Sequence, residues 1–106
     1  MAIGDTVTNE ALLGEKARIP GHVVYRPFVK ETVILNLQAG KYHGLNPTGG
    51  RMLELIERSP TIGAAARQLA EEYGRPLEAM QADLCDFCRD LLARGLIEVG
   101  APDVGD

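Results

Sequence analysis

Two short segments in the first half of the chain alternate or cluster β-branched and aromatic residues. They are HVVYRPF over residues 22–28 and ETVILNL over residues 31–37, and such compositions are typical of β-strands. Four residues, QAGK, separate the second segment from YHGLN. Gly40 in this loop can adopt the positive φ that a short hairpin needs. The pattern predicts a three-stranded antiparallel meander.

Apolar residues at helical spacing dominate the second half of the chain. Three helical patterns cover approximately residues 46–60, 61–74 and 76–95. Asn46 and Thr61 are favourable N-cap residues, and glycines follow the second and third patterns, as is common at helix C-termini. Three strands followed by three helices predict an α+β domain of the winged-helix-like type.

The two ends of the chain lack sustained periodicity. We expect residues 1–20 to form a flexible N-terminal arm that is closed by the turn at Pro20-Gly21. The folded domain is then predicted over residues 21–99, with LIEV as a short apolar tail and a frayed C-terminal segment over residues 100–106.

Composition and charge narrow the possible partners. The 106 residues are 45% hydrophobic and 25% charged, which fits one globular domain. The formal net charge of -4 disfavours binding to phosphate backbones and to anionic membranes. The N-terminal residues resemble neither a secretory signal nor a membrane span. We therefore expect a cytoplasmic protein with no nucleic-acid or membrane partner.

The third helical pattern has a wider apolar face than one packed helix needs. An ordinary core stripe is formed by Leu77, Met80, Leu84, Phe87 and Leu91. Cys85, Cys88 and Leu92 extend this stripe by roughly another 60 to 80° at about 100° per residue. The extra surface could pack under the N-terminal arm or against the hairpin. It could equally form the wall of a groove that accepts side chains of an added peptide strand.

The outer strands of the predicted meander differ in their capacity to pair. Pro27 has no backbone N–H, so the first strand lacks a hydrogen-bond donor there and pairs less readily with a further strand. The third strand, Lys41 to Leu45, has no proline, so an extended peptide could pair with it beside the third helix. Gly44 predicts a bulge or a close helix contact that turns Tyr42 and Leu45 to the same face.

Other chemistry has little support in the sequence. Cys85 and Cys88 with His22 and His43 could supply four zinc ligands, although half a site on a helix and two isolated histidines are a weak pattern. A redox role is not favoured, because reactive Cys-x-x-Cys thiols lie at helix N-termini. The single serine, Ser59, precedes a proline and belongs to no hydrolase motif. We predict no catalytic residue, no cofactor and no metal.

The charged side of the third helix bears on one alternative function. Asp83, Asp86 and Asp90 alternate there with Arg89 and Arg94, as on a solvated face with local ion pairs. A winged-helix DNA-binding regulator would use this helix as its DNA-recognition helix. Recognition helices concentrate positive charge, which this helix does not.

The sequence also resembles a known family, the PqqD-like proteins or precursor-peptide recognition elements. The resemblance covers about residues 20–99 and is carried by ETVILNLQAGKYHGLNPTG, LELIERSPTIGAAARQLAEEYG and ADLCDFCRDLLARGLIEV. Its most specific positions are Gly40, Tyr42, Gly44, Leu45 and Asn46, with Asp83 and the later Leu91-Leu92 and Gly95-Leu96 spacing.

This resemblance implies a non-enzymatic chaperone that binds the leader of a ribosomally made precursor peptide and presents it to modifying enzymes. The leader would add to the third strand and lie against the third helix. Carried over to this chain, the implied peptide-binding residues are Lys41, Tyr42, His43, Gly44, Leu45, Cys85, Cys88, Arg89 and Leu92.

Two flanking segments indicate a subfamily. RIPGHVVYR and LNPTGGRML are most similar to stand-alone recognition proteins of lasso-peptide pathways. The implied partners there are a leader-cleaving cysteine protease and an ATP-dependent cyclase. The pyrroloquinoline quinone pathway, with a radical-SAM partner, is the alternative.

Overall fold

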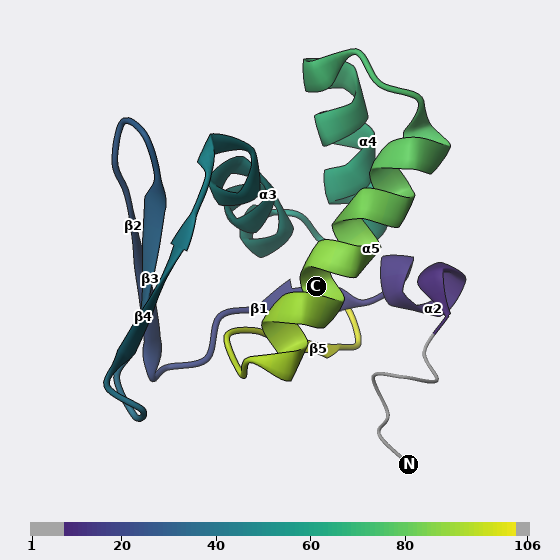
Figure 1. Ribbon diagram of the computed structural model, residues 1–106. Helices are drawn as coiled ribbons and strands as arrows, with labels where there is room; N and C mark the ends of the chain where they lie inside the picture. Colours follow the sequence, from purple (N-terminus) through teal and green to yellow (C-terminus); the bar gives the residue numbers. More distant parts are fainter. Residues whose placement is uncertain (1–7, 104–106) are drawn as a thin grey trace.

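The computed structural model describes residues 8–103 and confirms the predicted α+β class. Its strands are β1 (Lys16–Arg18), β2 (Val23–Pro27), β3 (Thr32–Asn36), β4 (Lys41–Leu45) and β5 (Glu98–Gly100). Its helices are α2 (Asn9–Leu13), α3 (Pro47–Arg58), α4 (Ile62–Tyr73) and α5 (Leu77–Ala93). Figure 1 shows the three-stranded sheet on one side of α3, with α4 and α5 on the other. No helix within residues 8–103 is long and apolar enough to cross a membrane.

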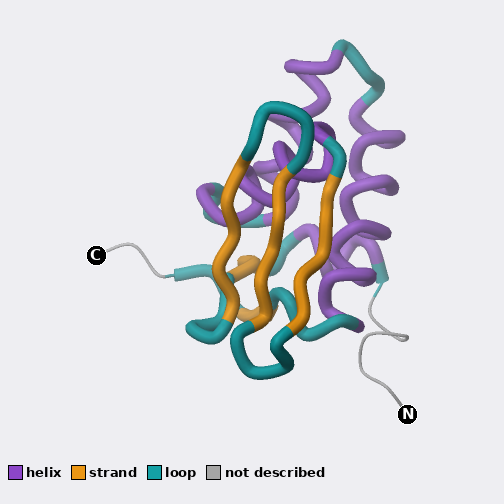
Figure 2. The backbone as a smooth tube through the Cα atoms, turned by 60° about the vertical axis from the view of Figure 1, so that its left-hand side comes forward, coloured by secondary structure: helices purple, strands orange, loops and turns teal. Residues whose placement is uncertain are grey.

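The main sheet is the predicted antiparallel meander, in the order β2-β3-β4. Gly40 has the expected positive φ of 65° in the loop between β3 and β4. Ile34 at the centre of β3 is buried. The next residue, Leu35, pairs with Val24 and Tyr42 on the opposite face. That face is exposed, and Figure 2 shows the sheet from this uncovered side.

The predicted bulge at Gly44 is wrong. Gly44 pairs with Val33 and Leu45 pairs with Thr32 in an uninterrupted register. Because side chains alternate along a strand, Tyr42 and Leu45 point to opposite faces of the sheet. A Cβ on Gly44 would lie 2.9 Å from a carboxylate oxygen of Glu31, so its nearest neighbour belongs to the loop before β3 and not to a helix.

The N-terminus of α3 is held close to the sheet. Asn46 caps the helix by accepting a hydrogen bond from the backbone N–H of Gly49 at 2.8 Å. A Cβ on Gly50 would lie 2.2 Å from Oγ1 of Thr32, so only glycine permits this approach of α3 to β3. The close contact fixes where α3 lies relative to β4.

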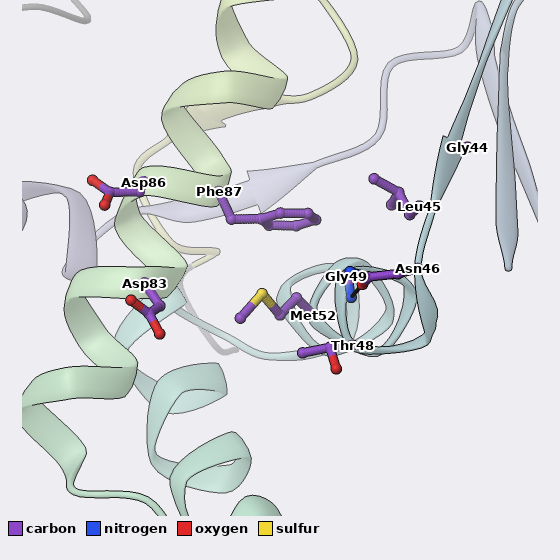
Figure 3. Close-up of a pocket in the computed structure, with 9 residues that line it drawn as sticks. All are labelled: Gly44, Leu45, Asn46, Thr48, Gly49, Met52, Asp83, Asp86 and Phe87. Atoms are coloured by element: carbon purple, nitrogen blue, oxygen red, sulfur yellow. Dashed lines mark hydrogen bonds between the residues drawn. The ribbon is translucent and has the colours of Figure 1, made fainter.

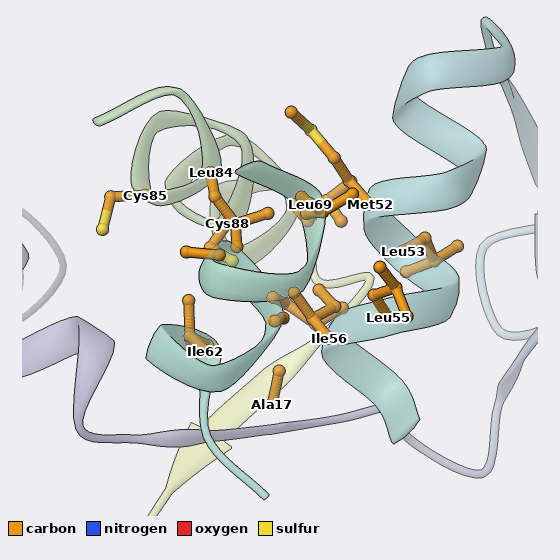
Figure 4. Close-up of a cluster of buried hydrophobic side chains, with 14 of the residues drawn as sticks. Ala17, Met52, Leu53, Leu55, Ile56, Ile62, Leu69, Leu84, Cys85 and Cys88 are labelled. Carbon is orange, nitrogen blue, oxygen red and sulfur yellow. The ribbon is translucent and has the colours of Figure 1, made fainter. Parts of the chain in front are cut away.

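The hydrophobic core lies between the three long helices (Figure 4). Leu53 and Ile56 of α3 meet Leu69 of α4 and Leu84 of α5, and all four are buried. The boundaries of α4 follow the sequence prediction, because the Thr61 side chain caps its N-terminus and Gly74 ends it in the left-handed conformation.

Residues 8–20 contradict the expectation of a flexible arm. Leu12 in α2 and Ala17 in β1 are each only 1% exposed. β1 pairs with β5 in a second, two-stranded sheet. Residues 1–7 lie outside the described part of the chain.

The C-terminal segment is also more structured than predicted. The last residues of the predicted LIEV tail, together with Gly100, form β5. Beyond this strand, Arg18 donates to the carbonyl of Ala101 at 3.0 Å and pairs with Asp103 at 2.6 Å. The predicted frayed segment is therefore tied down as far as residue 103, and residues 104–106 lie outside the described part.

Candidate functional site

β4 is an open edge of the main sheet. Within residues 8–103 it pairs only with β3, as predicted, so the backbone N–H and C=O groups along its other side can accept a further strand. Lys41, Tyr42 and Gly44 are exposed, while His43 and Leu45 are half-buried toward the helices. β2 forms the opposite edge and ends at Pro27, which cannot donate to a neighbour.

An open cleft of about 550 Å³ lies beside this edge. β4 and the start of α3 supply one wall, α3 supplies the floor, and α5 supplies the other wall (Figure 3). Phe87 extends from α5 toward Leu45, above Met52 of α3. The lining residues are Gly44, Leu45, Asn46, Thr48, Gly49, Met52, Asp83, Asp86 and Phe87.

The placement of Cys85 and Cys88 on this groove is wrong. Both are 0% exposed, and Sγ of Cys85 lies 3.8 Å from the carbonyl oxygen of Asn9 in α2. Burial raises the pKa of both thiols, that of Cys88 to about 12. The extra apolar surface of α5 therefore packs under the chain's own N-terminal segment, which is the other possibility that the sequence left open.

Arg89 and Leu92 belong to the same flank of α5. At about 100° per residue they lie roughly 160° and 140° around the helix from Phe87. Leu92 packs against the core, and Nη1 of Arg89 lies 3.7 Å from Asp86. Neither lines the cleft. Of the predicted site residues, the structure brings only Gly44 and Leu45 into its lining, with Lys41, Tyr42 and His43 on the adjoining edge.

Sequence reasoning missed Phe87, Met52 and the carboxylates of α5 as groove residues. Arg94 pairs with Asp90 at 3.1 Å and Arg89 with Asp86 at 3.7 Å, so the predicted local ion pairs are present. Asp83 pairs instead with Arg75, at 2.6 Å, and Asp83 and Asp86 border the cleft. One signal was available. Phe87 stands on the boundary between the apolar stripe and the acidic side, where a helix residue can be partly buried and still reach a ligand.

A polar contact links Arg94, the residue that follows α5, to His43 of β4. Nη1 of Arg94 lies 3.3 Å from Nδ1 of His43. Nε of Arg94 also donates to Asp90 at 3.1 Å. The groove is therefore apolar around Phe87, with Asp83 and Asp86 in its lining and the Arg94–His43 contact beside it.

The two cysteines and two histidines that were considered as zinc ligands, and not favoured, are not gathered in one place. Across residues 8–103 no three His, Cys, Asp or Glu side chains lie close enough to hold a metal ion. Cys85 and Cys88 lie under α2, whereas His43 lies on β4 beside Arg94. What the cleft offers is a strand edge for hydrogen bonding, an apolar floor and carboxylates on its rim.

Fold and site together define a small α+β domain whose open sheet edge faces a helix across a groove. The family model described as Coenzyme PQQ synthesis protein D (PqqD) matches residues 31–97. These residues include β3, β4 and the three long helices. The chain belongs to the PqqD family.

Solved structures extend this comparison. The structure described as TbiB1 in complex with the TbiA(beta) leader peptide is 32% identical, with a TM-score of 0.72, and the match covers 81% of this chain and 99% of that one. The structure described as lasso peptide synthetase B1 complexed with the leader peptide is 20% identical, with a TM-score of 0.69, and the match covers 78% and 98% of the two chains. No curated protein matches the sequence.

Proposed function

We propose that this protein binds the leader segment of a ribosomally synthesised precursor peptide as an additional strand on β4 and presents it to modifying enzymes without itself catalysing a reaction. The observation that carries the proposal is the cleft between β4 and Phe87, open beside a strand edge that has no partner strand within residues 8–103. A relative that is 32% identical over most of the chain is described in complex with a leader peptide, which supports the same function here.

Approximate energies indicate which groups supply affinity. Four or so new backbone hydrogen bonds give about 0.5 to 1.5 kcal/mol each, while ordering a flexible peptide costs about 2 to 5 kcal/mol. Two apolar side chains buried over Leu45, Met52 and Phe87 would add about 1.5 to 3 kcal/mol each. A micromolar complex, about 8 kcal/mol, therefore depends on the apolar floor of the groove.

The proposed partners follow from the subfamily. The similarity of RIPGHVVYR and LNPTGGRML to stand-alone lasso-pathway proteins favours a leader-cleaving peptidase and an ATP-dependent cyclase. A radical-SAM enzyme of quinone-cofactor synthesis is the alternative, as the description of the family model suggests. The genes beside this one distinguish the two, since a short precursor gene would accompany either a peptidase and cyclase or a radical-SAM enzyme.

Amide NMR titration tests the proposal. The probes are the TbiA(beta) leader peptide and a synthetic leader taken from a neighbouring precursor gene, with a scrambled peptide of the same composition as control. We expect shifts in the amide signals of residues 41–45 and of the Phe87 side of α5. Shifts confined to other surfaces would contradict the proposal.

The DNA-binding alternative receives no support. The helix that would enter a groove carries Asp83, Asp86 and Asp90 on the side open to solvent, which repels phosphates. Salt-dependent retention of the protein on duplex DNA at low ionic strength would revive this alternative.

A further inference from the structure

Arg94 follows Phe87 along the wall of the groove. The two are seven residues apart, and about 100° per residue returns the helix to within about 20° of the same direction after two turns. From this position Arg94 reaches across to β4, where Nη1 lies 3.3 Å from Nδ1 of His43. Arg94 therefore adjoins the groove at the end where it contacts His43, although it is not one of the residues that line the cleft.

The register of β4 determines what an added strand would place beside Arg94. His43 and Leu45 are two residues apart and both turn toward the helices. Side chains of a neighbouring strand alternate in the same way. An inward side chain next to Leu45 would lie over Phe87 and Met52, and the next inward side chain, two residues away, would lie next to His43 and meet Arg94.

This inference rests on the proposed function: we propose that Arg94 is a specificity-determining residue that binds an acidic side chain of the leader, two residues from the leader's apolar anchor. A guanidinium carries five N–H donors, and within the described residues Asp90 and His43 engage two of them. The remaining donors suit a carboxylate, which guanidinium groups bind through paired hydrogen bonds. Arg94 is 50% exposed, so a peptide can reach it.

The other end of the groove carries the opposite charge. Asp83 and Asp86 line it. Asp83 is paired with Arg75 at 2.6 Å, and Asp86 is 80% exposed, with Nη1 of Arg89 at 3.7 Å. Lys41 is exposed on β4 at the Arg94 end. Arg94 and Lys41 outnumber Asp90 at one end, whereas Asp86 presents an exposed carboxylate toward the other, so an acidic side chain is favoured at the Arg94 end.

The positions of these charges also predict the order of residue types along the bound peptide. Antiparallel pairing is slightly more stable per residue than parallel pairing, and it continues the alternation of the existing sheet. A strand antiparallel to β4 passes Leu45 before His43. The expected order from the peptide's N-terminus is a large apolar residue, any residue, then Asp or Glu.

Selection from a random peptide library tests this inference. Displayed peptides of about 12 residues, long enough to span β4 at about 3.3 Å per residue, are selected on the immobilised full-length protein. We expect enrichment of the apolar-x-acidic order. The Arg94→Glu variant should instead enrich Lys or Arg at the third position.

Arg58→Glu is the matched control. Arg58, like Arg94, lies at the C-terminal end of a helix and pairs with the acidic residue four positions earlier, Glu54. Unlike Arg94, it lies near Tyr25 of β2, on the opposite edge of the sheet from β4. The control should keep the acidic preference.

A double-mutant cycle on one selected peptide supplies the quantitative test. Arg94→Gln should weaken binding of the acidic peptide about tenfold and leave its Asn or Gln counterpart within about twofold. Equal losses for both peptides, or binders that shift the β4 amide signals without acidic enrichment, would overturn the inference while leaving the proposed function in place. Failure to obtain peptides that shift those signals would overturn both.

Discussion

Phe87 lies between the two walls and the floor of the groove. It extends from α5 toward Leu45 and lies above Met52 (Figure 3). A Cβ on Gly49 would lie 3.6 Å from the Phe87 ring, an ordinary contact distance, so the ring packs beside the start of α3. Under the proposed function, Phe87 would contact a bound peptide together with Leu45 and Met52.

Phe87→Ala should weaken peptide binding strongly. Loss of an apolar anchor worth about 1.5 to 3 kcal/mol corresponds to roughly 10- to 100-fold in the dissociation constant. Isothermal titration with a peptide that shifts the β4 amide signals measures the change. Leu92→Ala is the matched control, because Leu92 is also half-buried but on the α2 flank of α5; a comparable loss in that variant would contradict the placement of the groove.

At the scale of elements, α5 is covered differently on its two flanks. α2 covers the flank with Cys85 and Cys88, and the opposite flank with Phe87 stays open to the cleft. The short α2 is thus part of the domain, since its Leu12 is 1% exposed. An apolar surface on a helix becomes a ligand site only where the chain leaves it uncovered.

Leu12→Ala should lower the free energy of unfolding by about 2 to 5 kcal/mol, the usual cost of removing a buried leucine side chain. Urea denaturation measures this loss, and Glu10→Ala, at an exposed position of the same helix, serves as control. A loss below about 0.5 kcal/mol, as at surface positions, would show that α2 does not pack as described.

Thiol alkylation gives a second measurement of the same contact. Cys88 is fully buried and its pKa is raised to about 12, so at pH 8 it should react slowly with iodoacetamide. Opening of α2 in Leu12→Ala should speed the reaction of Cys85 and Cys88, as followed by mass spectrometry. Fast alkylation of the unmodified protein would contradict the burial of this flank.

At the scale of the whole molecule, the segments near the two ends of the chain pair with each other, and the N-terminal one also contacts α3. β1 and β5 pair across most of the sequence. Nζ of Lys16 in β1 donates to the carbonyls of Ile56, Glu57 and Ser59 at the end of α3. These carbonyls have no partner within the helix, and burial lowers the pKa of the lysine. The N-terminal segment thereby fixes α3, which carries the floor of the groove.

Lys16→Met should reduce the free energy of unfolding by about 1 to 2 kcal/mol, because charged hydrogen bonds to the terminal carbonyls are lost. Thermal or urea denaturation measures this change. Lys30→Met, at an exposed loop position, should be close to neutral. Equal effects of the two substitutions would indicate that the Lys16 contacts contribute nothing.

The sequence by itself determined the features that depend on near neighbours. Caps such as Asn46 and Thr61 bind N–H groups three residues ahead, and Gly40 sets the hairpin by its own φ. The open edge of β4 also followed from composition, because Pro27 marks the opposite edge. Such features need only local spacing and backbone preference.

Only the tertiary structure decided which flank of α5 is open. The periodicity showed a face that was too wide, but Cys88 and Phe87 lie on the same apolar stripe and no local pattern tells which part the rest of the chain covers. β1 and β5 have three residues each and partners about 80 positions away, so neither has a recognisable pattern of its own. Burial is a property of the packed whole, and the groove is the part of the surface that packing leaves uncovered.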